Sequence, residues 1–167
     1  MTILWILLAA LAAFIAVLLL RAAAFQPAKK PAVAQTVCHV DEAAAAQRFA
    51  RLIQFRTVSY MDESLEDAAE FTKLQDYLTT AYPNVTAACP REIIGRRGML
   101  YRWQGKSPDK PSVLMAHYDV VPVEESQWQE PPFSGLIKDG ELWGRGTLDT
   151  KGTMHGILEA AELLIAR

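Results

Sequence analysis

The sequence predicts an α/β fold preceded by one N-terminal hydrophobic helix. Three observations carry this prediction. A long apolar run opens the chain, several later segments have helical periodicity, and residues 113–116 (VLMA) form a short apolar run without polar alternation. Such a run is typical of a strand buried on both faces of a sheet. Helices that alternate with buried strands predict an α/β sandwich. Residues 41–167 hold only one clear central strand, so the predicted sandwich is incomplete.

Composition narrows the class of protein. The chain has 167 residues, enough for one domain at most, and 51% of them are hydrophobic, which excludes a wholly disordered chain. Two cysteines cannot build a disulfide framework or a four-cysteine zinc site. The net charge of −2 gives no sign of a nucleic-acid-binding domain. Charge is uneven, because residues 1–36 hold three basic and no acidic side chains, so we consider the two parts separately.

Residues 3–20 are 18 consecutive apolar residues. A helix of this length rises roughly 27 Å, close to the hydrocarbon thickness of a bilayer. The run is either an uncleaved membrane anchor or a signal peptide, with small residues at 22–24 or 32–34 as cleavage sites. Its length, and the lack of a preceding Lys or Arg, favour the anchor. We expect a protein that is membrane-anchored or exported, to a periplasmic, extracellular or lumenal site.

Orientation in the membrane stays open. The basic residues Arg21, Lys29 and Lys30 all follow the apolar run, so a positive-inside count places the C-terminal side in the cytoplasm, against export. The predicted organisation is an anchor or signal segment over residues 1–24, a Pro- and Ala-rich linker over 25–40 and a domain over 41–167. We expect Cys38 and Cys89 to be two unrelated thiols, the alternative being a disulfide, which requires an oxidising compartment.

Local signals predict the elements of the soluble part. Asp41 can cap a helix that reaches Gln54, and Pro83 ends the next helix. The predicted elements are, in order, a helix over 41–54, a helix over 65–81, a hairpin over 93–104, the buried strand over 113–116, a hairpin over 136–143 with its turn at 139–140, and a helix after Gly152.

Two clusters of residues could carry chemistry. His117 and Asp119 follow the predicted buried strand, where ligands collect in open α/β sheets. A neutral imidazole can bind a divalent metal while a carboxylate accepts its other N–H. Asp149 lies 32 residues later in a glycine-rich loop (GRGTLDTKG), just before a helix, and a carboxylate can bridge two metals. Taken alone, each cluster is also consistent with a plain strand end or a helix cap.

Together the blocks resemble the zinc aminoacylase/carboxypeptidase family, which includes carboxypeptidase S, aminoacylase, succinyl-diaminopimelate desuccinylase and bacterial glutamate carboxypeptidase. The similarity covers residues 41–167 and is greatest to the carboxypeptidase S-like branch. The blocks that carry it are AHYDVVPV at 116–123, Trp128, PPFSG at 131–135, Asp139-Gly140 and GRGTLD-x-KG at 144–152.

The resemblance implies a role for each residue. His117 is expected to bind one zinc ion, Asp149 to bridge two zinc ions, and Asp119 to act as the catalytic-site residue that orients His117. Two metals would acidify a bridging water that attacks an amide carbonyl. Cobalt or manganese suits similar ligands. The expected substrates are small peptides or N-acyl amino acids, and relatives also imply a homodimer of the complete protein.

The departures define the alternative. Thr150 stands where many relatives have a second aspartate, a tolerated variation because the ligand position itself, Asp149, is kept. The larger departure is that the downstream glutamate pair, a further Asp and a distant His of relatives have no counterpart among these residues. We therefore expect an N-terminal fragment of such a hydrolase that is inactive alone. The alternative is a non-catalytic membrane-attached fragment or pseudoenzyme. Glu124 and Glu125 are adjacent but lie in a loop, so we expect them to be solvated. We expect His155 to pack or to lie at the surface, and not to bind metal.

Overall fold

The computed structural model describes residues 2–26 and 38–167. It divides into two units, Met1–Cys38 and His39–Arg167. The chain has the predicted α/β class, with one N-terminal apolar helix. Lys29, Lys30 and the second cleavage site at 32–34 lie outside the described residues, as does most of the predicted linker.

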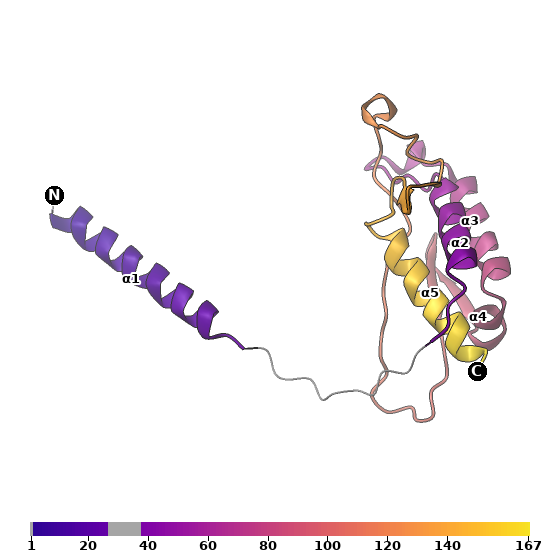
Figure 1. The fold of residues 1–167 in the computed structure, drawn as a ribbon, viewed down its shortest axis with the longest axis horizontal. Helices are drawn as coiled ribbons and strands as arrows, with labels where there is room; N and C mark the ends of the chain where they lie inside the picture. The colour runs from indigo at the N-terminus through magenta and orange to yellow at the C-terminus, as the bar shows by residue number, and fades with distance from the viewer. Residues whose placement is uncertain (1, 27–37) are drawn as a thin grey trace. The chain divides into compact units, whose positions relative to one another are not determined.

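The first unit contains helix α1 (Thr2–Ala24), which has no buried residue (Figure 1). Among the described residues it is the one helix long and apolar enough to cross a membrane. A signal sequence has the same length and composition, so this helix is consistent with both alternatives drawn from the sequence.

The second unit begins with helices that have side-chain caps. Asp41 accepts a hydrogen bond from the Ala44 N–H at 3.0 Å and starts α2 (Glu42–Gln54), as predicted. Asp67 caps α3 (Ala68–Ala81) in the same way, three residues later than predicted, because a short 3-10 turn (Glu63–Leu65) comes first. Pro83 ends α3 and also opens α4 (Pro83–Ala88), a helix that the sequence analysis did not predict.

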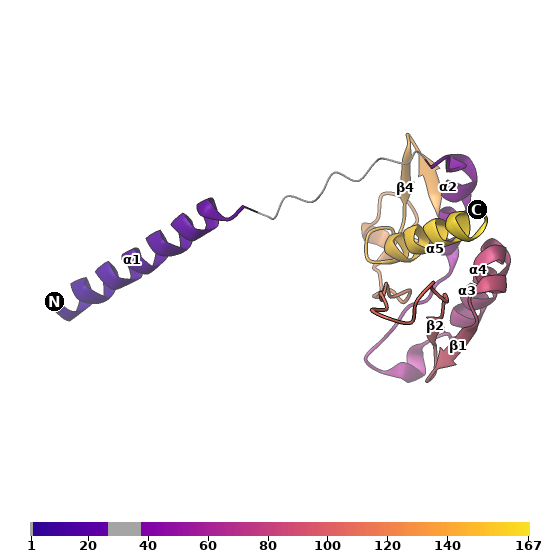
Figure 2. The ribbon, with the colours of Figure 1, turned by 90° about the horizontal axis from the view of Figure 1, so that it is seen from below.

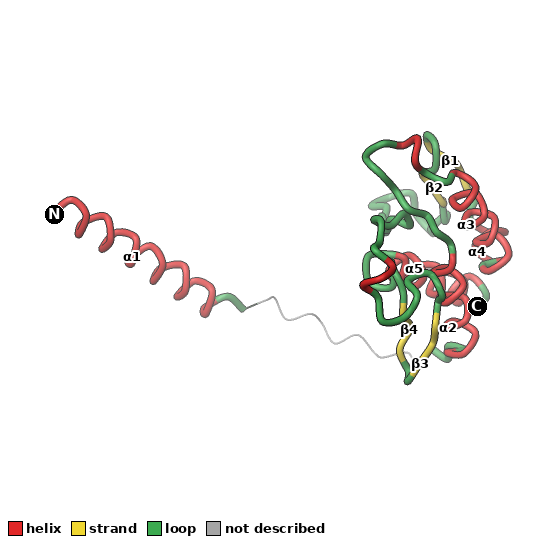
Figure 3. The backbone as a smooth tube through the Cα atoms, turned by 90° about the horizontal axis from the view of Figure 1, so that it is seen from above, coloured by secondary structure: helices red, strands yellow, loops and turns green. Residues whose placement is uncertain are grey.

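Two antiparallel hairpins provide the strands. Strand β1 (Arg91–Ile94) pairs with β2 (Gly98–Tyr101), and β3 (Leu136–Lys138) pairs with β4 (Glu141–Trp143). Both hairpins were predicted. Figures 2 and 3 show them on opposite sides of α5 (Lys151–Ile165), with β1–β2 beside α3 and α4, and β3–β4 beside α2.

The predicted buried strand over 113–116 is wrong. Within the described residues no strand forms there, and Val113, Leu114 and Met115 are 76%, 73% and 81% exposed. An apolar strand is buried on both faces only when it pairs with neighbouring strands in a sheet whose two faces are covered by other elements. The described residues provide no such pairs, and the nearest pairing is a single parallel bridge between Val58 and Val120.

The core lies between the helices. Leu52 and Leu74 have no exposed surface, and Met154 from α5 packs in the same cluster. The hairpin β3–β4 is fixed to α2 by Gly135, whose φ of +62° suits glycine and whose missing side chain leaves space for the Ala50 carbonyl oxygen. The helical layer therefore provides a packed base for the residues that precede α5.

Candidate functional site

Residues 117–120 are held against the chain that leaves α2. The Val120 N–H donates to the Thr57 carbonyl at 2.8 Å, and the Ser59 N–H donates to the Val120 carbonyl at 2.9 Å. The Thr57 hydroxyl, fully buried, donates to the Tyr118 carbonyl at 2.5 Å. These bonds fix the backbone on the C-terminal side of His117.

His117 lies between two aspartates. Its Nδ1 is 3.0 Å from the Asp119 carbonyl oxygen and 3.3 Å from the Asp119 carboxylate, and its Nε2 is 3.0 Å from Asp149 Oδ1. The other Asp119 carboxylate oxygen accepts from the Ser59 hydroxyl at 2.7 Å. The structure thus brings together all three residues that the sequence singled out.

These contacts indicate which nitrogen of the His117 ring carries a hydrogen and where a positive charge is favourable. A carbonyl oxygen only accepts, so Nδ1 carries a hydrogen, and Nε2 then faces a carboxylate oxygen. That pair of atoms is stabilised by a positive charge, either a proton on Nε2 or a bound cation. Partial burial lowers the pKa of His117, but the hydrogen bonds to Asp119 and Asp149, with their negative charges, outweigh it and raise the pKa above its ordinary value.

The Asp149 loop is anchored from behind by Lys151. The Lys151 side chain is completely buried, and its ammonium group donates to the carbonyl oxygens of Leu52 at 3.1 Å and Phe55 at 2.7 Å, at the C-terminal end of α2. A cation is favourable at this end of a helix. Burial lowers the pKa of Lys151 to about 8, although the charges of Glu70 and Asp119 act against it.

Gly146 allows the loop to pass close to this lysine. Its φ is +93°, and a Cβ atom there would lie 2.9 Å from Val120 Cγ1 and 3.2 Å from Lys151 Cδ. Only glycine combines this conformation with this approach. The loop therefore stays close to residues 117–120, and the Asp149 side chain is left exposed.

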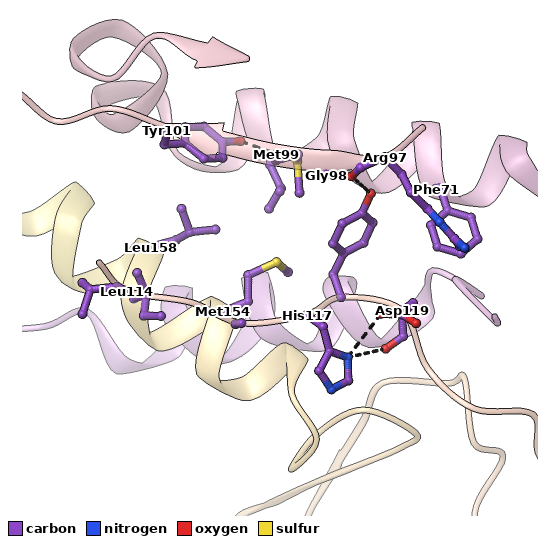
Figure 4. A pocket seen from close by; sticks show the side chains of 14 residues that line it. Phe71, Arg97, Gly98, Met99, Tyr101, Leu114, His117, Asp119, Met154 and Leu158 are labelled. Carbon is purple, nitrogen blue, oxygen red and sulfur yellow. Dashed lines mark hydrogen bonds and ion pairs between the residues drawn. The ribbon is translucent and has the colours of Figure 1, made fainter. Parts of the chain in front are cut away.

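A cavity of about 420 Å³, lined by both apolar and polar side chains, adjoins His117. Its lining includes Leu114, Met154 and Leu158, while the His117 ring points away from these side chains (Figure 4). Tyr118 also lines the cavity, and its hydroxyl donates to the Arg97 carbonyl at 2.5 Å. The same cavity is lined by His117 and Asp119, so apolar side chains lie close to these two residues.

His117 and Asp149 are side chains of the types that bind zinc, but they are fewer than a zinc site requires. An imidazole nitrogen and a carboxylate oxygen are common zinc ligands, and catalytic zinc sites use three protein ligands. Among the described residues, no group of three or more His, Cys, Asp or Glu side chains is arranged to hold a metal ion. His117 and Asp149 therefore fit part of a metal site.

Comparison with known proteins identifies the family. Residues 113–167, which include His117, Asp119 and Asp149, match the family model of peptidase family M20/M25/M40. The chain belongs to this family. It is 39% identical over 126 residues to probable carboxypeptidase S-like 2 of Dictyostelium discoideum, a match over 73% of this chain and 24% of that protein.

Two further relatives fall in the same family. N-fatty-acyl-amino acid synthase/hydrolase PM20D1 of Homo sapiens is 42% identical over 69% of this chain and 23% of its own length. Carboxypeptidase S of Saccharomyces cerevisiae is 43% identical over 57% of this chain and 18% of its own length. The chain spans about a quarter of the length of the first of these curated relatives.

Several side chains that support His117 and its neighbours were missed by sequence reasoning. Ser59 and Thr57 support residues 118 and 119 from 60 residues away, and Lys151 was noted only as part of the family block. One signal was present, because Thr57 and Ser59 alternate around Val58 with the period of extended chain. Glu124 and Glu125 are exposed, as the sequence predicted, and His155 is largely buried, which is the packing alternative of the two left open for it.

Proposed function

We propose that this protein acts in a zinc-dependent hydrolase that cleaves amide bonds in small peptides or N-acyl amino acids. The observation that carries the proposal is the 3.0 Å approach of His117 Nε2 to Asp149 Oδ1, with Nδ1 turned to Asp119. Family membership and the names of the relatives support a hydrolase of peptides or acyl amino acids.

Each side chain has a separate role in this proposal. His117 would bind metal through Nε2 because its Nδ1 hydrogen is held by Asp119. Asp149 would bridge two zinc ions with its two carboxylate oxygens, and cobalt or manganese could replace zinc. Bound metal would supply Lewis acidity to the reacting carbonyl and water. Ser59 keeps the Asp119 carboxylate in place for its contact with His117.

The location and organisation of the protein form part of the same proposal. Residues 1–24 would anchor the protein in a membrane or direct its export. Residues 25–40 would link this segment to residues 41–167, which would form part of the catalytic domain. The apolar length of α1 supports this division. A homodimer of the complete protein completes the proposal, on the basis of the family resemblance.

One observation favours the alternative for this chain alone. Only two metal donors, His117 and Asp149, meet among the described residues, and no side chain there is assigned as general base. The 167-residue chain by itself would then be non-catalytic.

The test measures metal content and hydrolysis in the natural gene product. We expect His117→Ala and Asp149→Ala each to abolish hydrolysis of N-acyl amino acids and dipeptides, and to weaken zinc binding by more than the roughly 10- to 100-fold typical of losing a supporting contact. His39→Ala removes an exposed histidine outside the site and is the matched control, with no change expected. Unchanged zinc affinity in both site variants would contradict the proposal. A product without zinc or hydrolysis would support the non-catalytic alternative.

A further inference from the structure

Thr150 occupies the position of a helix cap without capping the helix. It is the N-cap residue of α5, yet its side chain makes no capping hydrogen bond. Threonine is favoured at this position because its hydroxyl normally accepts from an N–H of the first turn. The hydroxyl of Thr150 is therefore engaged elsewhere, at the expense of its own helix.

The partner of this hydroxyl is the backbone of His117. Thr150 Oγ1 accepts from the His117 N–H at 3.2 Å and donates to the His117 carbonyl at 3.0 Å. A hydroxyl can do both because it has one hydrogen and two lone pairs. One side-chain atom thus holds both polar backbone groups of the residue whose imidazole approaches Asp149.

We propose that Thr150 is a positioning residue, whose hydroxyl holds the His117 backbone at the spacing that brings His117 Nε2 and Asp149 Oδ1 together for metal binding. This inference rests on the proposed function. Thr150 touches neither of these two side-chain atoms; it acts through the backbone of His117.

The contact matters because other restraints on His117 come from one side. Residues 118–120 are bonded to Thr57 and Ser59, while residues 113–115, before His117, are largely exposed. Thr150 itself is fixed through its neighbour Lys151, which is buried and bonded to the end of α2. The hydroxyl therefore connects Thr150, which is fixed through Lys151, to the backbone of His117 where the exposed segment 113–115 ends.

The test compares Thr150→Val, which keeps the shape and removes the hydroxyl, with Thr150→Ser, which keeps the hydroxyl. Thr153→Val makes the same change at an exposed position of α5 and is the matched control. The readouts are zinc affinity by chelator competition, hydrogen exchange of the His117 amide and the thermal midpoint, all on the 167-residue chain in detergent micelles.

We expect Thr150→Val to bind zinc about 10- to 100-fold more weakly and to lose protection of the His117 amide. The serine and Thr153→Val variants should stay within about threefold of the original affinity, below the range for a lost supporting contact. A Thr150→Val variant that is folded and binds zinc as the original chain does would overturn the inference.

Hydrogen exchange separates this inference from the proposed function. If the original chain binds no zinc, the zinc assignment fails for this chain, and the His117 amide still decides the role of Thr150. Faster exchange in Thr150→Val, restored in Thr150→Ser, supports the backbone contact. Equal exchange in all variants contradicts it.

Discussion

Two regions of residues 39–167 are built in different ways. One is the helical layer, helices α2 to α5, and the other is the site edge, residues 113–120 and 144–150. Leu52 and Leu74 in the helical layer have no exposed surface, whereas Leu114 and Met115, just before His117, are 73% and 81% exposed. Packing holds the first region. Hydrogen bonds hold the site edge. Thr57 and Thr150 donate them to backbone carbonyl groups, and Ser59 donates to the Asp119 carboxylate.

Because of this difference, we expect the stability of the fold and the binding of metal to depend on different residues. Close packing makes every buried methylene count, so changes in the helical layer should affect unfolding first. At the site edge, a lost hydroxyl or carboxylate should affect metal binding while the fold persists. The predictions below test this separation, and they concern the 167-residue chain in detergent micelles.

The largest effect is expected in the core. Leu74→Ala removes a fully buried side chain and should lower the free energy of unfolding by about 2–5 kcal/mol. Met115→Ala, at an exposed apolar position, should change it by less than about 0.5 kcal/mol. Denaturant unfolding followed by circular dichroism measures both. Similar losses in the two variants would show that residues 113–116 are packed after all.

An intermediate effect is expected where the two regions meet. Lys151→Met removes the buried ammonium group that joins the Asp149 loop to the end of α2 and leaves the Leu52 and Phe55 carbonyls without this donor. The free energy of unfolding should fall by about 1–3 kcal/mol.

Lys138→Met provides the control for this lysine. Lys138 is half-exposed and paired with Glu130 on the surface, so its loss should cost less than about 1 kcal/mol. The comparison is made by the same denaturant titration. A Lys151→Met variant as stable as the Lys138→Met variant would show that the buried contact does not hold the two regions together.

The smallest effect is a pH dependence within the helical layer. His155 stacks on Phe49, its Nδ1 lies 2.9 Å from the Tyr82 hydroxyl, and the charged groups that face it are Glu159 of α5 and Arg48 of α2. Burial lowers the pKa of His155, against the attraction of Glu159. Between this lowered folded pKa and the ordinary pKa of about 6.5, the unfolded chain therefore binds a proton that the folded chain does not.

The sign of this effect follows from linkage. The free energy of unfolding should fall as the pH drops from about 6.5, by at most about 1.4 kcal/mol per pH unit from this residue. His117 contributes with the opposite sign because its folded pKa is raised. Subtracting the pH profile of His155→Gln isolates the residue, and His39→Gln serves as control. An unchanged slope in His155→Gln would contradict the prediction.

The elements that could be predicted from sequence have local causes. Asp41 and the apolar period after it specify α2, and Asp139 and Gly140, both with positive φ, specify the β3–β4 turn. Pro83 shows the limit of such signals, since one residue ends α3 and begins α4. The apolar run at 113–116 was predicted to be buried, but burial depends on partners that no local pattern supplies.

The site was predictable only in part, for the same reason. The blocks around His117 and Asp149 led to the family, and family membership is confirmed. The roles of His117, Asp119 and Asp149 stay predictions. The contacts that orient them join residues 57 and 59 to residues 118–120, and residue 150 to residue 117. The alternation at residues 57–59 indicates extended chain, but one sequence does not show which distant residues such a segment contacts.

The close approach at Gly135 affects how its conservation among related sequences should be interpreted. Every single-base change in its codon that alters the amino acid introduces a Cβ atom, and that atom would overlap with the Ala50 carbonyl oxygen. Selection should therefore remove such alleles whether or not the protein has any catalytic role. If this glycine is invariant among descendants of one ancestor, its invariance records the seating of a hairpin on a helix. A pseudogene in this lineage would show relaxed constraint there as soon as folding ceased to matter.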